Sequence, residues 1–565
     1  MSNNPTSSLP ELNYGEIRVT FLGGLGEIGR NCAAIEYKEK MLLIDCGLMF
    51  PNEEMPGVDL VLPDFTWLIE NKEKMVGVVV THGHEDHMGG LSYLAHDIEL
   101  NVYGSKLTMR LAQQRFQEAN LMNRATFNDV NDSDRINIGP FDVEFIPVTH
   151  SVPHGFAIAI HTELGAIIHT GDFKIDMTPV DGRRTDLSRI GTIATTEGVL
   201  LLLADSTNAD REGITDSEMN IGSSLEKIFG DKSDKRIIVA CFASHLHRIE
   251  GILKAARKTG RHVVFFGKSM ARNVAIASEL GVLDVPPDTL LAPDEIDTVD
   301  PHKLCVISTG SQGEPLSALS LLAAGEHRAL SVSNDDVVIL SSQPIPGNER
   351  AVSRVIDGLS RRGCEVIHSG TALVHASGHA RRSELAVFHA LAKPEWFIPV
   401  HGEYRHLVAH AHLARNLGLA KERALVCVDG DSVRITESGL EKDGKVSAGY
   451  LYVDGIVGDV GHGVLKDRKI LSEEGVIVVV VGVDVTKTSV ITGPDVITRG
   501  WVHADEAEDL LDEAKVVVRE AIEGVLGHGS TDLDALRQAM RKSLGKFVSG
   551  KTKRRPMIVP FVMEI

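Results

Sequence analysis

The sequence contains little cysteine and no long hydrophobic run, and each absence excludes a class of protein. The six cysteines among 565 residues lie far apart and form no C-x-x-C pair, which argues against a disulfide framework and favours a reducing cytoplasm. The longest apolar run, residues 476–483, is far shorter than the roughly 20 residues that a membrane-spanning helix needs. Residues 1–9 are polar, so no secretory signal is expected.

Basic residues are outnumbered by acidic ones. The chain has 58 lysines and arginines against 78 aspartates and glutamates, a net charge of −20. Proteins that bind nucleic acid non-specifically are usually basic, so this total argues mildly against a polynucleotide substrate. It does not exclude a local basic groove. The length predicts roughly two to four domains, and 43% hydrophobic with 24% charged residues is typical of a globular protein.

Potential metal ligands are concentrated in residues 81–90. A short apolar, β-branched run directly before them predicts a buried strand that ends at this loop. His82 and His84 lie on one side of an extended chain, and Asp86 and His87 follow a turn. Neutral imidazoles and carboxylates are the ligands that zinc takes. A polar surface loop is the alternative, but this cluster at a strand end favours a metal site.

A glycine-rich turn suggests a competing function. Gly24, Gly26 and Gly29 fit G-x-G-x-x-G after a predicted strand at 17–22, with Asp45 downstream where a ribose-binding acid would lie. A dinucleotide site needs a helix after the last glycine. The residues after Gly29 alternate as a strand instead, and we therefore favour a structural turn.

Other predicted strands also end in a histidine or an aspartate. They place His150, Asp172, Asp205 and His401 just after apolar runs. Strands that end in this way assemble a site at one edge of a sheet. Each residue alone is more often a satisfied core or surface group, and the loop at 81–90 is what makes them candidates.

Composition and periodicity divide the chain into several parts. After about residue 215, helical patterns alternate with apolar strands, which indicates a parallel α/β domain inserted into the first, strand-rich domain. A compact α+β module follows near the end. We expect a disordered tail (1–15), a first domain in two parts (16–214 and 373–455), the inserted domain (215–372), a linker (456–469) and a C-terminal α+β domain (470–565).

The motifs resemble a known family. The loop at 81–90 fits H-x-H-x-D-H and resembles the metallo-β-lactamase superfamily. The inserted domain, with the motifs around Asp205, His379 and His401, resembles the β-CASP branch, whose members cleave nucleic acids. Over residues 17–565 the chain is similar to bacterial ribonuclease J. The implied fold is α/β: a metallo-β-lactamase αββα sandwich with an inserted β-CASP domain and a small C-terminal α+β domain.

This resemblance implies two zinc ions per chain, with manganese as the alternative metal. Two such ions activate a bridging hydroxide and stabilise in-line displacement at a phosphodiester. Asp205 and His379 are the implied proton-transfer residues, and an orienting carboxylate is the alternative role for Asp205. The implied ligands are His82, His84 and His150 for one ion, Asp86, His87 and His401 for the other, and Asp172 for both.

The implied activity is that of a 5′→3′ exoribonuclease that prefers a 5′-monophosphate on single-stranded RNA. Endonuclease activity and a role in rRNA and mRNA maturation and decay are implied as well. A plain helix N-terminus capped by Ser244 is an alternative that can coexist with phosphate binding. The implied substrate-binding residues are Ser244, His245 and Leu246, and His375, Ala376, Ser377, Gly378 and His379.

The resemblance also implies a homodimer or homotetramer and partners in RNA degradation. A structural calcium is implied at Gly57, Asp59 and Asp454, since oxygen ligands suit this ion; a turn carboxylate is the alternative there. The basic run 551–555 could contact RNA or an acidic partner, although such a run is usually a solvated loop. Because the chain is acidic, we expect a restricted basic groove and a modest salt dependence of RNA binding.

Three other functions remain open. A purely endonucleolytic β-CASP nuclease would release internal fragments rather than mononucleotides from a 5′-phosphorylated RNA. A non-catalytic RNA-binding scaffold would tolerate His84→Ala in every assay. A small-molecule metallohydrolase would turn over a chromogenic lactam or thioester.

Overall fold

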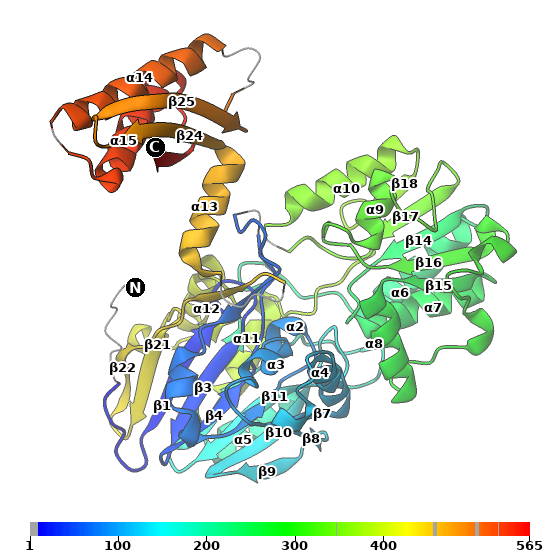
Figure 1. Ribbon diagram of the computed structural model, residues 1–565. Helices are drawn as coiled ribbons and strands as arrows, with labels where there is room; N and C mark the ends of the chain where they lie inside the picture. Colours follow the sequence, from blue (N-terminus) through cyan, green and yellow to red (C-terminus); the bar gives the residue numbers. More distant parts are fainter. Residues whose placement is uncertain (1–8, 53, 346, 456–459, 503–507, 529) are drawn as a thin grey trace. The chain divides into compact units, whose positions relative to one another are not determined.

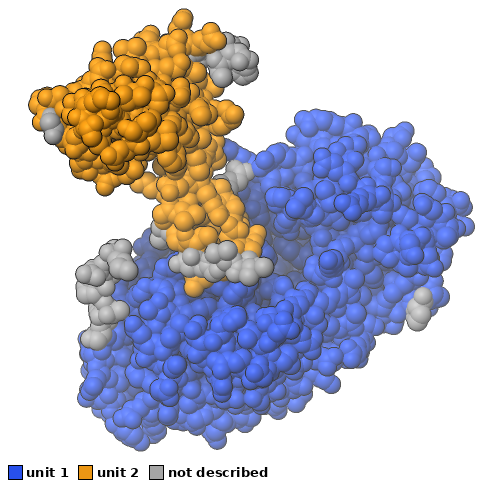
Figure 2. Space-filling model, viewed as in Figure 1, with its two compact units in different colours: residues 1–50, 60–450 blue, residues 51–59, 451–565 orange. Residues whose placement is uncertain are grey.

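The computed structural model describes residues 9–52, 54–345, 347–455, 460–502, 508–528 and 530–565. The chain forms two compact units, shown in different colours in Figure 2. Unit 1 comprises residues 1–50 and 60–450, and unit 2 comprises residues 51–59 and 451–565. Residues 1–8 of the predicted disordered tail lie outside the described residues. Among the described residues, no helix is both long and apolar enough to cross a membrane.

Two β-sheets pack against each other in unit 1 and share one core, because apolar residues such as Phe21 and Ile35 from the first sheet and Phe145 and Ile158 from the second lie in one buried cluster. In spatial order the first sheet contains β22 (Gly439–Lys445), β21 (Asp431–Thr436), β1 (Ile17–Gly23), β3 (Cys32–Tyr37), β4 (Lys40–Ile44), β6 (Met75–Val79), β7 (Leu100–Ser105) and β8 (Ala125–Val130). The second contains β19 (Trp396–Val400), β13 (Val199–Asp205), β12 (Gly165–His169), β11 (Gly155–Thr162), β10 (Phe141–Val148) and β9 (Arg135–Ile138).

Helices cover the outer faces of this pair of sheets (Figure 1). On the second sheet, Ile190, Phe388 and Ala411 from three helices join a second buried cluster with Ile168 and Leu202. Those helices are α5 (Leu187–Thr196), α11 (Arg382–Ala392) and α12 (Tyr404–Asn416). Helices α2 (Glu85–Met88), α3 (Leu91–Leu94) and α4 (Lys106–Glu118) follow β6 and β7 of the first sheet. The predicted αββα sandwich is therefore confirmed.

The glycine-rich turn does not open a helix. After Gly29 the chain enters β3, and the short strand β2 (Leu25–Gly26) within the turn pairs with β20 (Gly402–Glu403) directly after His401. The turn thus supports the loop that carries the last predicted metal ligand, and the prediction that a strand rather than a helix follows Gly29 is confirmed.

The inserted domain is a parallel sheet with helices packed around it. Its strands are near-continuous apolar runs, as expected for a sheet buried on both faces, and Ile238, Val306 and Val338 lie in its core. In spatial order the strands are β15 (His262–Phe266), β16 (Leu304–Ser308), β14 (Arg236–Ala240), β17 (Asp336–Leu340) and β18 (Glu365–His368). The helices are α6 (Glu218–Asp231), α7 (Leu246–Lys258), α8 (Lys268–Glu279), α9 (Ala318–Ala324) and α10 (Glu349–Arg361).

Unit 2 contains a three-stranded sheet with two long helices packed on one face. Val479, Val518 and Met540 meet in the core between them. The elements are α13 (Gly461–Glu473), β24 (Val476–Asp484), β25 (Ser489–Arg499), α14 (Glu508–Gly527), α15 (Leu533–Thr552) and β26 (Met557–Glu564). The sequence did not predict β25, because its Gly493-Pro494 pair is typical of a turn. Of the predicted linker, residues 456–459 lie outside the described residues and α13 begins soon after them.

Candidate metal centre

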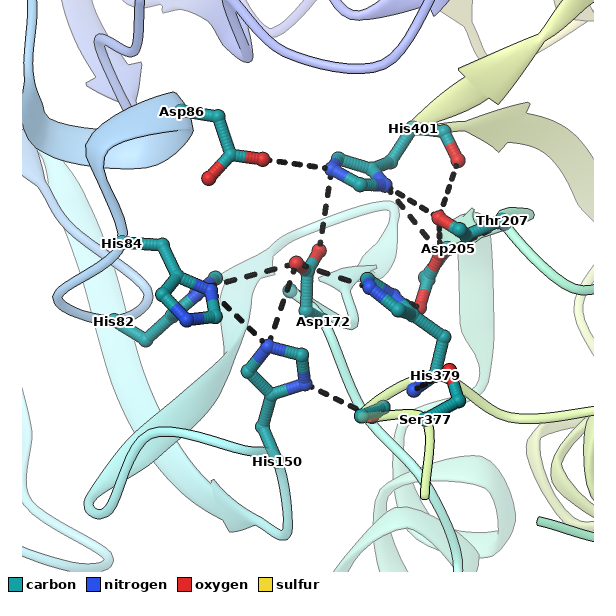
Figure 3. A network of polar contacts seen from close by, with 12 residues as sticks. His82, His84, Asp86, His150, Asp172, Asp205, Thr207, Ser377, His379 and His401 are labelled. Atoms are coloured by element: carbon teal, nitrogen blue, oxygen red, sulfur yellow. Dashed lines mark hydrogen bonds and ion pairs between the residues drawn. The ribbon is translucent and has the colours of Figure 1, made fainter. Parts of the chain in front are cut away.

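Loops that follow several strands converge at one edge of the two sheets of unit 1 (Figure 3). His150 follows β10, Asp172 follows β12, Asp205 ends β13 and His401 follows β19. With the loop after β6, they form three groups in which one ligand atom of each residue lies within 4.8 Å of all the others. The groups are His82, His84, His150 and Asp172; Asp86, His87, Asp172 and His401; and Asp172, Asp205, His379 and His401.

The first group has the dimensions of a tetrahedral metal site. His84 Nδ1 lies 3.0 Å from His82 Nε2 and 3.3 Å from His150 Nε2. Asp172 Oδ2 lies 3.6 Å from His82 Nε2 and 3.7 Å from His150 Nε2. Ligands about 2.1 Å from a central zinc are about 3.4 Å apart, so this donor set fits the ion.

The second group shares Asp172 with the first. His87 Nε2 lies 3.2 Å from Asp172 Oδ2 and 3.6 Å from Asp86 Oδ2. His401 Nε2 lies 3.3 Å from Asp86 Oδ2 and 3.8 Å from the other Asp172 oxygen, Oδ1. That Oδ1 is buried and has no hydrogen-bond partner. A carboxylate between two donor groups, with one oxygen unsatisfied, fits a bridging ligand.

Protonation favours metal binding in the first group. Burial lowers the pKa of His82, with repulsion from His87 adding to the effect, and burial also lowers the pKa of His150. Burial lowers the pKa of His84 to about 4. All three imidazoles are therefore neutral at pH 7, which is the form that binds a metal ion.

Buried carboxylates control protonation in the second group. Burial raises the pKa of Asp172, but His401 and His87 outweigh burial and hold it well below its usual value. Burial lowers the pKa of His401, but Asp172, Asp205 and Asp86 outweigh burial and raise it to about 10. The imidazole gains a proton because buried carboxylates surround it, and a divalent cation would neutralise the same charge.

Asp45 orients one of the predicted ligands. Its carboxylate accepts hydrogen bonds from Thr81 N at 2.7 Å and Thr81 Oγ1 at 2.9 Å, and it lies 2.7 Å from His87 Nδ1. Such contacts fix the tautomer of a ligating histidine and leave Nε2 for the metal. The sequence suggested only a ribose-binding role for Asp45, although its position directly after β4 is the signal that the other site residues share.

Two other ligands are held in the same way. His150 Nδ1 lies 2.8 Å from the carbonyl oxygen of Gly378, and His401 Nδ1 lies 2.7 Å from Thr207 Oγ1. Gly378 has no room for a side chain, since a Cβ there would lie 2.5 Å from the His150 ring. Gly47 is equally constrained, because a Cβ would lie 1.7 Å from the carbonyl oxygen of Asp86. Both glycines therefore allow the backbone to approach the ligands.

A row of charged side chains connects the metal loop to the inserted domain. Glu85, between two predicted ligands, accepts a hydrogen bond of 3.0 Å from Arg115 Nε on α4. Arg115 also pairs with Glu118 at 3.4 Å, and Glu118 forms an ion pair with Arg272 on α8. These residues could not be predicted from the sequence, because their pairing depends on tertiary structure. Glu85 lies inside the predicted motif, which is the only local signal for it.

The predicted proton-transfer residues lie together beside the metal groups. His379 Nδ1 lies 2.8 Å from Asp205 Oδ2 and 4.0 Å from Asp172 Oδ2. Burial lowers the pKa of His379, but the carboxylates of Asp205 and Asp172 outweigh burial and raise it. Ser377 accepts hydrogen bonds from the His379 N–H at 3.2 Å and from Asn208 Nδ2 at 2.9 Å. The loop at 377–379 is thereby fixed next to the ligands.

The other predicted substrate-binding segment lies at the start of α7. The helix begins at Leu246, its N-cap residue is His245, and no side chain caps it. The alternative that Ser244 caps this helix is therefore wrong. Leu246 and Ala376 are buried, so their side chains are not available to a ligand and only their backbone groups remain as candidates.

A buried ion pair links the two predicted substrate-binding segments. Arg248 pairs with Glu218 and donates a hydrogen bond of 2.9 Å to the carbonyl oxygen of Val374, directly before His375. Glu218 lies 3.5 Å from His245 Nε2. His375 Nδ1 is buried without a hydrogen-bond partner. The structure therefore brings the segments together, and their role in substrate binding stays a prediction.

Two of the predicted calcium ligands bind an arginine. Arg468 donates hydrogen bonds to the carbonyl oxygens of Gly57 at 2.9 Å and Pro56 at 3.3 Å, and it forms an ion pair with Asp454. Asp59 accepts a hydrogen bond of 2.7 Å from the N–H at residue 455. A calcium ion would have to displace the guanidinium, so these residues do not fit calcium as arranged, and that site stays a prediction.

Comparison with known families covers most of the chain. Residues 25–217 match the metallo-beta-lactamase superfamily, and residues 370–426 match the family described as the Zn-dependent metallo-hydrolase RNA specificity domain. Residues 234–359 match the ribonuclease J beta-CASP domain, and residues 463–565 match the ribonuclease J C-terminal domain. Along the chain, the matches correspond to the first part of the sandwich, the inserted domain, the second part of the sandwich and the final α+β domain.

Individual proteins are similar over nearly the full length. Ribonuclease J of Mycolicibacterium smegmatis is 40% identical over 562 residues, covering 98% of this chain and 99% of that protein. Ribonuclease J of Thermus thermophilus is 40% identical, with 97% and 95% covered. Ribonuclease J 1 of Streptococcus pyogenes is 38% identical, with 98% of both covered.

A solved structure supports the fold. The crystal structure of a protein of unknown function from Enterococcus faecalis V583 aligns with a TM-score of 0.51 at 16% identity, covering 74% of this chain and all of that one. At this identity the likeness bears on the fold alone. The family matches and the full-length relatives go further: the chain belongs to the ribonuclease J family of metal-dependent ribonucleases, within the metallo-β-lactamase superfamily.

Proposed function

We propose that the chain hydrolyses RNA phosphodiester bonds with two zinc ions held by the seven predicted ligands, with manganese as the alternative metal. The observation that carries this proposal is the position of Asp172, which belongs to both donor groups and has an unsatisfied oxygen. When bound, two such cations activate a water molecule and stabilise the negative charge that develops on the phosphate.

Within this proposal His379 transfers a proton and Asp205 positions it. Asp205 is buried and accepts hydrogen bonds from the backbone N–H and the hydroxyl of Thr207, at 2.9 and 2.8 Å. Its second oxygen contacts His379, whose side chain is 19% exposed against 1% for Asp205. The more exposed imidazole can reach the leaving 3′-oxygen, while the carboxylate fixes the ring.

The proposed substrate is single-stranded RNA with a 5′-monophosphate, degraded in the 5′→3′ direction, with endonucleolytic cleavage as a second activity. Family membership supports this choice, and so does the buried pair of Arg248 and Glu218, which connects His245 to the segment that leads into His375. We place the activity in rRNA and mRNA maturation and decay in the cytoplasm, with RNA-degradation partners.

Product analysis tests this function. A 5′-monophosphorylated, 5′-end-labelled RNA is incubated with the protein and zinc or manganese, and release of labelled mononucleotide is the expected result. His84→Ala is expected to abolish the release. Internal fragments alone would indicate a purely endonucleolytic enzyme, and no cleavage with either metal would contradict the proposal.

We also propose a homodimer or homotetramer assembled through unit 2. The sheet face opposite its helices carries Ile497, Phe561 and Met563, which are 51%, 52% and 47% exposed. Exposed apolar residues on one face are typical of an interaction surface. Light scattering after size-exclusion chromatography is expected to show an oligomer, and Phe561→Glu is expected to shift it toward the monomer. An unchanged oligomer in that variant would exclude this face.

A further inference from the structure

Basic charge in unit 2 is concentrated on α15 and the loop that follows it. Residues 533–555 contain eight basic side chains and one acidic one, Asp534, a local charge of +7 in a chain of net charge −20. Helix α14 is the opposite, with six acidic and two basic residues. The eight basic side chains are all exposed, and we call them the α15 basic surface: Arg537, Arg541, Lys542, Lys546, Lys551, Lys553, Arg554 and Arg555.

Most of this charge is not neutralised. Arg537 pairs with Asp534 at 2.8 Å, and Lys551 pairs with Glu513 of α14 at 2.6 Å. Within the described part of the chain, no ion pair joins any of the other six side chains to a carboxylate. A face that serves only solubility mixes both signs of charge, so unpaired charge of one sign indicates an anionic partner.

A groove with an aromatic wall adjoins the α15 basic surface. It has a volume of about 480 Å³ and lies between α14 and α15. Lys551 Nζ lies 5.7 Å from the centre of the half-buried Phe547 ring. A Cβ at Gly550 would meet no atom within 4 Å, which leaves this part of the groove open. The groove is lined by Val517, Ser543, Lys546, Phe547, Gly550 and Lys551.

We infer that this groove and the α15 basic surface bind single-stranded RNA, separately from the metal centre. One base would stack on Phe547, and the adjoining phosphates would contact Lys542 and Lys546. An aromatic platform beside cationic side chains is how proteins hold single strands without reading their sequence. An acidic protein segment would match the charge, but acidic side chains do not stack on an aromatic ring as RNA bases do. RNA is therefore the better match.

The inference rests on the proposed function, because it assumes that RNA is the substrate. It extends that function by adding a second contact to the same strand. A strand held at two places on one chain binds more tightly than at either alone, since the second contact is intramolecular. The expected consequence is a lower KM for long RNA than for a substrate of a few nucleotides.

The test measures binding without cleavage. Full-length protein carrying His84→Ala is titrated into a fluorescent, unstructured 20-nucleotide RNA with a 5′-hydroxyl, and anisotropy gives the Kd. Adding Phe547→Leu, which keeps an apolar side chain but removes the ring, is expected to weaken binding about tenfold. Adding Lys542→Ala and Lys546→Ala is expected to weaken it and to reduce the slope of log Kd against log salt by about 1.4, or about 0.7 per phosphate contact.

The matched control is Lys466→Ala with Lys487→Ala, which removes the same charge from elsewhere in unit 2. This control is expected to leave Kd and salt slope unchanged. If the control and the α15 lysine variant weaken RNA binding equally, the total charge of the protein rather than the α15 basic surface determines the Kd, and the inference is overturned. An unaffected Phe547→Leu variant, together with displacement of the RNA by a polyglutamate peptide, would assign the surface to an acidic protein and overturn it as well.

RNA cleavage is measured separately with protein that retains His84, so that failure of this inference can be distinguished from failure of the proposed function. If it degrades RNA while the α15 variants bind RNA normally, only the inference fails. If it binds RNA through α15 but cleaves none with either metal, only the proposed function fails. With both intact, the α15 variants are expected to raise KM for a long RNA about tenfold and to leave kcat and tetranucleotide hydrolysis unchanged.

Discussion

Nδ1 of His379 lies 2.8 Å from Oδ2 of Asp205, although 174 positions separate the two residues in the chain. The inserted domain occupies most of that interval, so the contact joins the two parts of the sandwich on either side of it. His379 follows the insertion, and Asp205 ends a central strand before it. The geometry at the proposed proton-transfer site therefore depends on how the two parts of the sandwich, before and after the insertion, pack together.

Replacing Asp205 tests the positioning role. In Asp205→Asn the amide no longer holds the His379 ring through a charged contact, and kcat on RNA is expected to fall roughly 10²- to 10⁴-fold. Metal content, measured by mass spectrometry of the purified protein, is expected to stay unchanged. Loss of metal would make Asp205 a ligand instead. Asp210→Asn, an exposed carboxylate in the same loop, is the control and should retain activity.

Removing metal ligands tests the shared carboxylate. Asp172 belongs to both donor groups and His84 to only one, so Asp172→Asn is expected to lower metal content more than His84→Ala. Both variants are expected to lose RNA hydrolysis, because either cation alone leaves the transition state under-stabilised. His96→Ala, an exposed histidine outside the groups, should bind metal normally. Equal metal loss in the two ligand variants would contradict a bridging role.

The sequence could predict the ligand types and the parallel α/β insertion because both are local patterns, whereas the layered sandwich was implied by the resemblance. A strand followed by His82, His84, Asp86 and His87 is visible in a short window, and buried parallel strands are near-continuous apolar runs. The strand-end positions predicted that Asp172 would lie near these ligands, but its role in both donor groups could be inferred only by resemblance. The orienting contacts could not be predicted, because Asp45 and Arg115 act on the metal loop across 42 and 30 positions.

Arg115 offers a test of that long-range support. Glu85 has one buried oxygen without a hydrogen-bond partner, so removing Arg115 would leave a half-buried carboxylate without its cation next to two ligands. Arg115→Ala is expected to weaken metal binding roughly 10- to 100-fold, measured by competition with a metal-binding dye. Arg110→Ala, on the same helix and paired with Glu279, should bind metal as the parent does. An unchanged affinity in Arg115→Ala would show that α4 does not support the metal loop.

Arg468 gives an expectation for calcium. Its guanidinium already supplies positive charge to Asp454 and the carbonyl oxygen of Gly57, so EGTA is expected to leave the Tm of the protein unchanged. Arg468→Ala frees these oxygens, and added calcium is then expected to raise the Tm of that variant. A large drop in Tm of the unmodified protein on adding EGTA would instead support calcium at Gly57, Asp59 and Asp454.

His161 predicts how stability depends on pH. It lies between two carboxylates, 2.9 Å from Glu144 Oε2 and 2.5 Å from Glu197 Oε2. Burial lowers the pKa of His161, but these two contacts outweigh burial and raise it above its usual value. A raised pKa in the folded state stabilises the protein fully below about pH 6.5, the value in an unfolded chain. That stabilisation is lost as the pH rises through the folded value.

His161→Gln is therefore expected to lower the free energy of unfolding more at pH 6 than at pH 9, measured by urea denaturation at both values. Ionisation of Glu144 does not contribute to the difference between the two pH values. Burial raises the pKa of Glu144, but contacts with His161 and Arg189 outweigh burial and lower it to about 2, so it stays ionised across this range. His96→Gln, exposed to solvent, is expected to show no such difference. A loss of stability in His161→Gln that is equal at pH 6 and pH 9 would mean that packing, rather than the charged pair, is what His161 contributes.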